Sequence, residues 1–152
     1  MPKKALLILI GILFTAATAM ASDSTRIQII PTFLGQKLVL DSTYSVAGNA
    51  LSIETFKCYL SQVCLFKNGK PVWQEPNSYH LLDASESQTL AWALMLPDQL
   101  SYDALQFNLG IDSLANVSGA MGGDLDPTNG MYWTWQSGYI NFKLEGYSPQ
   151  CA

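Results

Sequence analysis

The sequence has very little of what the common enzyme classes need. Its 152 residues contain a single histidine, His80, and only 13% of them are charged. No serine lies in a Gly-x-Ser-x-Gly frame, no pattern couples a cysteine to the histidine, and no glycine-rich phosphate loop precedes a helix. We therefore predict a protein that is not an enzyme.

Basic side chains are scarce as well. Eight Lys and Arg stand against twelve Asp and Glu, which gives a formal net charge of −4. Nucleic-acid binding relies on clustered Lys and Arg that neutralise phosphates. Since the chain has no basic run, we predict that nucleic acid is not its partner.

The one long apolar run lies at the N-terminus. Two lysines precede the apolar residues 5–14, and a small-x-small cleavage pattern ends at Ala21. The run is short for a membrane span. We expect residues 1–21 to be a signal peptide cleaved after Ala21. Residues 22–152 would then be one periplasmic or secreted domain without stable membrane insertion.

Cysteine is also rare, with Cys58, Cys64 and Cys151 alone. In an oxidising compartment the count fits either one disulfide with one free thiol or three unpaired thiols. On a shared strand, Cys58 and Cys64 would lie roughly 20 Å apart, which no disulfide spans. We predict that these two are not bonded to each other, and Cys151 is the more plausible partner for one of them.

Period-two alternation dominates what is present. Residues 52–66 are apolar on both faces, which predicts the central strand of a sandwich, with a short helix over 52–59 as the alternative. Asn68-Gly69 predicts a tight hairpin turn. Further strands are expected at residues 26–33, 34–41, 71–74, 78–82, 89–96, 105–111 and 139–147. The last of these is expected to pack into the interior. We predict an all-β fold, an antiparallel β-sandwich or irregular barrel.

Residues 112–130 form the least regular segment, a long Gly/Asp-rich loop. Such loops are more often functional than not. Four of its side chains carry oxygens of the kind that calcium prefers: Asp112, Asp124, Asp126 and Asn129. The alternative is local turn chemistry without any metal.

His80 lies in an apolar strand context and is the best single metal ligand in the chain. Imidazole binds Cu(II) more tightly than the other common divalent ions. The alternative is a structural histidine that is hydrogen-bonded within the core. Residues 131–139 are dense in aromatic side chains, which by themselves are typical of a core.

The stretch GDLDPTNGMYWTWQSGYINFKLEG, residues 123–146, resembles the signature of the MbnP-like family, named for a copper-binding protein associated with methanobactin operons. Residues 107–112 with Asn116 resemble a second element of that family. The resemblance implies a periplasmic copper-binding β domain with His80 as a ligand. It also implies oxidation of Trp133 or Trp135 to kynurenine as a further ligand, carried out by a dihaem partner of the MauG type. The better-known relatives use more than one histidine, whereas this chain has one.

These observations together predict an exported domain that binds a metal, copper first. The alternative is a non-enzymatic binding or interaction module whose loop is ordered by calcium or by no metal.

Overall fold

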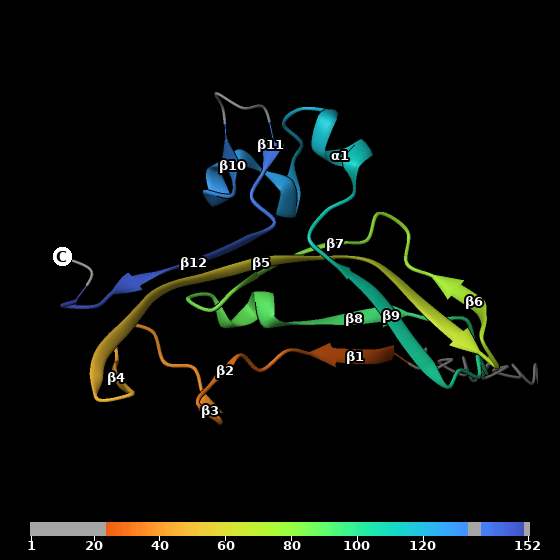
Figure 1. The fold of residues 1–152 in the computed structure, drawn as a ribbon. Helices are drawn as coiled ribbons and strands as arrows, with labels where there is room; N and C mark the ends of the chain where they lie inside the picture. The colour runs from red at the N-terminus through yellow and green to blue at the C-terminus, as the bar shows by residue number, and fades with distance from the viewer. Residues whose placement is uncertain (1–23, 134–137, 151–152) are drawn as a thin grey trace, which may run out of the picture.

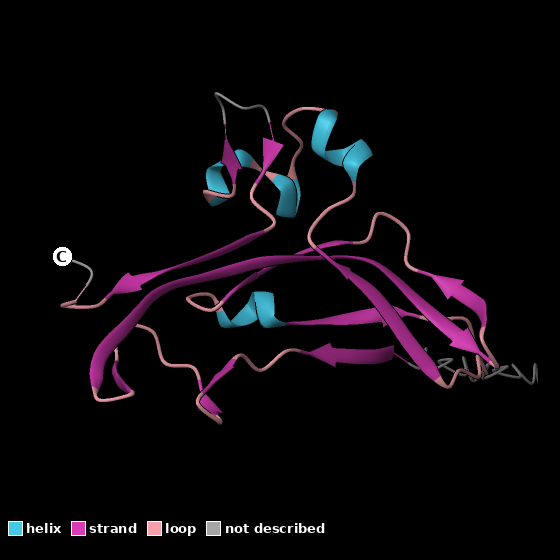
Figure 2. Ribbon diagram, viewed as in Figure 1, coloured by secondary structure: helices cyan, strands magenta, loops and turns pink. Residues whose placement is uncertain are grey.

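The computed structural model describes residues 24–133 and 138–150, and the predicted signal peptide and Cys151 lie outside these ranges. Antiparallel strands make up most of the described chain, as predicted (Figures 1 and 2). The strands are β1 Ser24–Gln28, β2 Thr32–Phe33, β3 Gln36–Lys37, β4 Thr43–Val46, β5 Asn49–Lys67, β6 Lys70–Gln74, β7 Tyr79–Asp83, β8 Ala91–Met95, β9 Ala104–Leu109, β10 Tyr132–Trp133, β11 Gly138–Tyr139 and β12 Phe142–Tyr147. The helical elements are α1 Ser113–Val117 and the 3-10 helices η1 Ser87–Leu90, η2 Gly123–Leu125 and η3 Pro127–Asn129. No helix in the described ranges is long and apolar enough to span a membrane.

Strand β5, 19 residues long, is the central strand of the main sheet. Strands β4, β7 and β6 pair along one of its edges, and β12 and β9 pair along the other. The register shows the two edges directly, because Cys58 pairs with Leu82 of β7 on one side and with Phe142 of β12 on the other. The predicted central strand is confirmed, and the alternative helix over residues 52–59 is wrong.

Two backbone irregularities in β5 explain features of its sequence. Gln62 has a positive φ of 54° at a register shift, so this β-bulge interrupts the apolar alternation. The strand ends in the predicted hairpin turn, where Asn68 and Gly69 have φ values of 51° and 73°. Positive φ at both positions matches the twist of the flanking strands.

Residues 111–140 interrupt what is otherwise one continuous edge. Strands β9 and β12 both run antiparallel to β5 along the same edge. The chain leaves the sheet and returns to it at Tyr59, whose carbonyl accepts from the Gly110 amide at 2.7 Å and whose amide donates to the Asn141 carbonyl at 3.1 Å. The described part of the excursion, with α1, η2, η3, β10 and β11, forms a lobe on one face of the sheet (Figure 1). We refer to it as the lobe.

The lobe is more regular than the loop that the sequence predicted. Residues 112–130 contain α1, η2 and η3. Carboxylates cap two of these elements: Asp112 accepts from the Ala115 amide at the start of α1, and Asp126 accepts from the Thr128 amide at the start of η3. The long segment that the sequence predicted thus contains three short helical elements.

Each face of the main sheet carries its own core. On the lobe face, Tyr59 and Leu81 pack with Leu125, Met131 and Tyr139. On the opposite face, buried residues of β5 and β7 pack against side chains of a second layer formed by the β1–β8 pair. The members of this second core are Cys58, Leu60 and Leu82, with Ile29, Leu90 and Trp92 from the second layer. Figure 1 shows the two layers, with β1 and β8 below β5.

Strand β12 forms as predicted but does not pack into the interior. Phe142 and Leu144 are 49% and 53% exposed. The second layer covers buried side chains of β5 and β7, so the face of β12 beyond them stays open. Cys58 and Cys64 are both buried and free, which confirms that they are not bonded to each other. Burial raises the pKa of the Cys58 thiol, which keeps it protonated.

Candidate metal site

His80 lies in the middle of β7 and points away from the lobe. Its neighbours Tyr79 and Leu81 pack with the lobe core, and alternate side chains of a strand face opposite sides. The imidazole stacks on the indole of Trp92 in β8, with ring centroids 4.1 Å apart and planes 22° from parallel. The His80 side chain is only 18% exposed.

A carboxylate holds one nitrogen of this imidazole. His80 Nε2 lies 2.7 Å from Glu75 Oε2, and the Glu75 side chain is 14% exposed. The same carboxylate oxygen accepts from Ser78 Oγ at 2.6 Å, and Ser78 Oγ in turn accepts from the Val63 amide at 2.9 Å. The β6–β7 connection is therefore tied to β5, and it fixes the carboxylate against the imidazole.

The other imidazole nitrogen is available. Among the described residues that are not fully exposed, Trp92 Nε1 is the one buried side-chain nitrogen or oxygen without a hydrogen-bond partner. His80 Nδ1 has no hydrogen-bond partner in the described ranges either. Since Nδ1 is not among the buried unpartnered atoms, it is in contact with solvent. In the neutral tautomer whose Nε2 donates to Glu75, Nδ1 carries the free lone pair.

A pocket of about 260 Å³ adjoins this imidazole. Its lining residues are His80, Leu81, Gln88, Thr89, Ala91, Trp92 and Asp124. Asp124 comes from η2 of the lobe, and its Oδ2 accepts from the Leu81 amide at 2.9 Å. The lobe and the sheet thus bring one carboxylate and one imidazole to the same pocket.

The other oxygen ligands predicted for calcium serve local structure. Asp112 caps α1 through the Ala115 amide at 2.9 Å and accepts from the Tyr79 hydroxyl at 2.7 Å. These two bonds lower the pKa of Asp112, and the bond to Asp112 raises the pKa of Tyr79. The Asp112 oxygens are therefore already used to fasten the lobe to β7.

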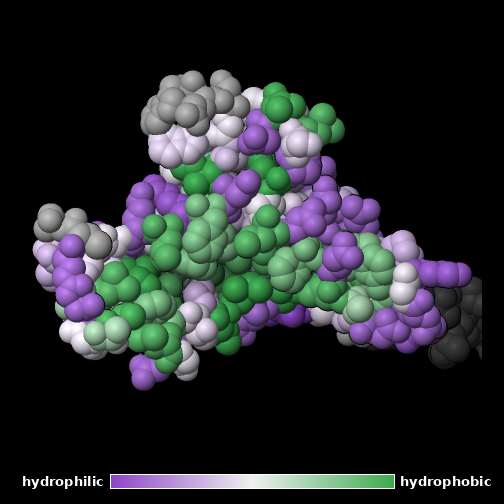
Figure 3. Space-filling model, in the orientation of Figure 1, coloured by the Kyte–Doolittle hydropathy of each residue, from purple (hydrophilic) through white to green (hydrophobic). Residues whose placement is uncertain are grey.

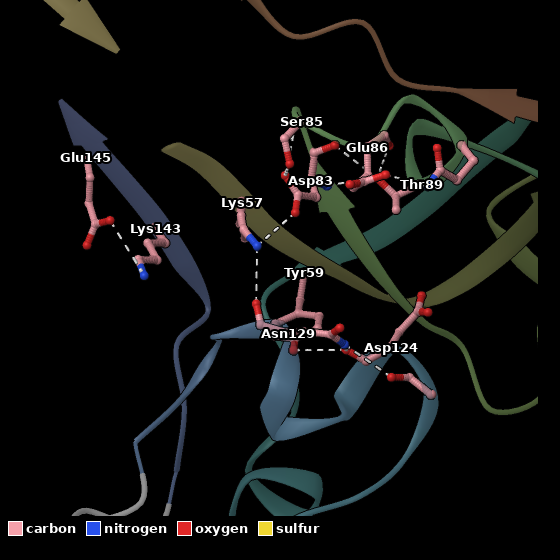
Figure 4. A network of polar contacts seen from close by, with 12 residues as sticks. Lys57, Tyr59, Asp83, Ser85, Glu86, Thr89, Asp124, Asn129, Lys143 and Glu145 are labelled. Carbon is pink, nitrogen blue, oxygen red and sulfur yellow. Dashed lines mark hydrogen bonds and ion pairs between the residues drawn. The ribbon is translucent and has the colours of Figure 1, made fainter. Parts of the chain in front are cut away.

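Asp126 and Asn129 are likewise engaged within the lobe. Asp126 Oδ1 accepts from the hydroxyl and the amide of Thr128, and these bonds lower its pKa. Asn129 Nδ2 donates to the carbonyls of Gly123 and Asp124 (Figure 4). Across residues 24–133 and 138–150, no group of three or more His, Cys, Asp or Glu side chains is placed to hold a metal ion.

The tryptophans singled out by the sequence do not lie beside His80. Trp133 is in β10 of the lobe, whereas His80 points to the opposite face of the sheet, so the sheet separates the two side chains. Trp135 lies outside the described residues. The tryptophan that contacts His80 is Trp92, which sequence reasoning missed. No local pattern connects Trp92 to His80, because the two come from strands of different sheets.

A partly buried ion pair within the sheet also contacts the lobe, through its lysine. Lys57 Nζ lies 2.8 Å from Asp83 Oδ2 and donates to the Asn129 carbonyl at 3.2 Å (Figure 4). Burial opposes ionisation of Asp83, but hydrogen bonds from Lys57 and Ser85 outweigh it, so the Asp83 pKa lies below its ordinary value. This pair is fully used in holding the lobe and offers no ligand.

Comparison with known proteins gives one match. The family model MbnP matches residues 22–152, nearly the whole chain. No curated protein and no solved structure matches the chain.

Proposed function

We propose that this chain, which belongs to the MbnP family, is an exported, non-enzymatic domain that binds copper at His80. One observation carries the proposal: an imidazole that a mostly buried carboxylate orients through Nε2, and whose Nδ1 has no hydrogen-bond partner, lines a pocket that a second carboxylate also lines. Histidines that bind metals commonly donate their other N–H to a carboxylate in this way, which fixes the tautomer and raises the basicity of the ligand nitrogen.

The donor set favours copper over calcium. Within the pocket, His80 would supply Nδ1 and Asp124 a carboxylate oxygen, with water completing the coordination. Imidazole nitrogen is a ligand for Cu(II), which heads the affinity order of the divalent first-row metals. Calcium takes six to eight oxygens, and of the four side chains predicted for it only Asp124 lines this pocket. Trp92 covers one face of the imidazole and holds its plane.

The resemblance adds a modified tryptophan to the proposal. Oxidation of Trp133 or Trp135 to kynurenine, by a dihaem partner of the MauG type, would create an amine and a ketone that can reach a metal, and at Trp133 these groups would belong to the lobe. Because the sheet separates Trp133 from His80, a kynurenine at Trp133 would form a site of its own. Peptide mapping of protein from its native compartment identifies any oxidised tryptophan and so tests this part separately.

Titration with Cu(II) tests the copper site directly. We expect chelator-treated protein to bind one equivalent, His80→Ala to weaken binding at least tenfold, and Glu75→Gln to weaken it less, because only the orientation of the imidazole is lost. Asp126→Ala is the matched control, since its carboxylate is engaged with Thr128 in the lobe, and it should bind as the wild type does. Equal affinities of the wild type and His80→Ala would overturn the proposal.

A second candidate, a binding or interaction module without a functional metal, is favoured by the polar groups of the lobe. The four side chains predicted for calcium all make hydrogen bonds with the protein, so the lobe has order of its own. This candidate replaces the first if copper affinity is independent of His80.

A further inference from the structure

An exposed apolar strip runs along the β9–β12 edge of the main sheet, on the face away from the lobe (Figure 3). We call it the apolar strip. Its members, with their exposed fractions, are Leu105 43%, Phe107 46%, Leu109 65%, Phe142 49% and Leu144 53%. Leu109 and Phe142 pair with Leu60 and Cys58, which belong to the core on that face.

The strip is comparable in area to the largest apolar patch on a typical monomer. With about 200 Å² for each side chain, the five members expose roughly 500 Å² of apolar surface. A patch of about 300–600 Å² is the largest on a typical monomer and is often functional. A standard interface buries about 800 Å² per partner around an apolar centre, so the strip is large enough to be that centre.

Strand β9 also has a free edge that nothing in its sequence protects. It pairs with β5 alone among the described strands, and all six of its residues are exposed. Its sequence, ALQFNL, contains no charged residue and no proline. Natural edge strands are usually blunted by one of these devices. The edge therefore remains able to pair with another strand.

The pattern of β9 reads the same in both directions around Phe107. Leu105 and Leu109 flank it at two residues, and the amides Gln106 and Asn108 flank it at one. In an antiparallel pair of two copies centred on Phe107, each leucine would oppose the other leucine of the second copy, and each amide would oppose the other amide. Opposed apolar side chains and opposed amides both stabilise such pairs. A two-fold interface requires this self-complementarity.

We infer that the occupant of this edge is a second copy of the chain, paired β9 to β9 into one continuous sheet. Charge at the edge does not oppose a copy as the partner: the chain is acidic, with net charge −4, but the paired strands would carry no charged residue. The adjacent Asp103 accepts from the Asn68 amide at 2.9 Å, which turns its carboxylate toward the β5–β6 hairpin. The lobe leaves this face uncovered, since it lies on the opposite one (Figure 1). The inference is independent of copper binding.

The oligomeric state of residues 22–152 tests the inference. We expect sedimentation velocity to show a concentration-dependent dimer. Phe107→Lys places two like charges opposite each other at the two-fold axis and should weaken dimerisation at least tenfold. The matched control is Val72→Lys, which makes the same change at a 40% exposed residue of β6 on the other edge of β5. It should dimerise as the wild type does.

A disulfide cross-link between two copies tests whether β9 pairs with β9 around Phe107. In a Cys151→Ser background, Phe107→Cys should form an intermolecular disulfide under mild oxidation. Residues opposed across an antiparallel pair have Cα atoms about 4.5–5.5 Å apart, within the range that a disulfide spans. Leu144→Cys, off the axis, should not cross-link to its own copy. A wild type that stays monomeric at 100 μM, or equal dimerisation of the Phe107→Lys and Val72→Lys variants, would overturn the inference. So would a cross-link at Leu144→Cys without one at Phe107→Cys.

Discussion

The two faces of the main sheet differ in how completely they are used. On the lobe face, Tyr59 OH donates to the Asp124 carbonyl at 3.0 Å and Tyr139 OH to the Leu125 carbonyl at 2.8 Å, so even the buried hydroxyls are paired. On the other face, Trp92 Nε1 has no partner and the apolar strip has no cover in the described chain. The first face has its buried hydroxyls paired, whereas the second leaves a buried N–H and several apolar side chains without partners in the described chain.

The family resemblance does not follow this contrast between the faces. Part of the resembling stretch 123–146 lies in the lobe, where Met131 and Tyr139 are buried, and part of it forms β12. The imidazole of His80 and the free edge lie on strands of the main sheet, β7 and β9. Four experiments probe how the lobe and its face of the sheet are held, each by comparing two substitutions.

The largest effect is expected from a cavity in the lobe core. Met131 is fully buried, so Met131→Ala removes apolar contacts and leaves a void that costs about 3 kcal/mol of unfolding free energy. Leu144→Ala, at a half-exposed residue of the apolar strip, should cost less than about 1 kcal/mol. Urea denaturation measures both at a low protein concentration. Equal losses would show that the two faces are equally packed.

Gly110→Ala tests the point where the lobe joins the sheet. Gly110 has a φ of 96°, and a Cβ there would lie 2.8 Å from the Asn141 Cγ, so strain and overlap together should cost about 2–3 kcal/mol. Gly119→Ala is the control, because its φ is 86° but the space around it is open, and the strain alone costs about 1 kcal/mol. A smaller loss for Gly110→Ala than for Gly119→Ala would mean that the junction adapts easily.

Tyr139→Phe removes one buried hydroxyl. That oxygen accepts from the Met121 amide at 2.9 Å and donates to the Leu125 carbonyl, so its loss leaves buried backbone groups unpaired and should cost about 2 kcal/mol. Tyr44→Phe breaks two bonds to Val39 that are exposed to water, and it should cost less than about 1 kcal/mol. Thermal unfolding of both variants measures which of them loses more stability. If Tyr44→Phe were the more destabilising, the lobe hydroxyls would not be structurally dominant.

Local patterns predicted the parts of the fold that depend on neighbouring residues. Asn68-Gly69 and the apolar run through β5 are of this kind, because turn angles and side-chain period are set within a few residues. The alternation of β12 showed which of its faces is apolar. It could not show that Phe142 stays half-exposed, because this depends on how far the second layer extends.

The candidate site depended on longer-range structure. His80 was identified as the chain's best ligand, but its contact with Trp92 joins two layers and its orientation by Glu75 requires the bend of the β6–β7 connection. Asp124 was predicted as a calcium ligand from its neighbours in sequence. The fold instead turns its side chain to β7, because an edge amide of that strand needs an acceptor.

The smallest expected effect is a pH dependence at the tie between lobe and β7. The Ala115 amide and the Tyr79 hydroxyl hold the pKa of Asp112 below its ordinary value, so the ionised carboxylate stabilises the fold above about pH 4. That stability is lost as pH falls through the lowered pKa. The loss should stay below about 1 kcal/mol, because the group is partly open to solvent.

In a plot of unfolding free energy against pH, Asp112→Asn should flatten the acid limb, between about pH 2 and 5. Tyr79→Phe should flatten it less, since the Ala115 amide remains. The same hydrogen bond raises the pKa of Tyr79, so the wild type should also lose stability above about pH 10, and Tyr79→Phe should lose less. An acid limb unchanged in Asp112→Asn would show that the lobe is held by apolar packing and by the Lys57 contacts instead.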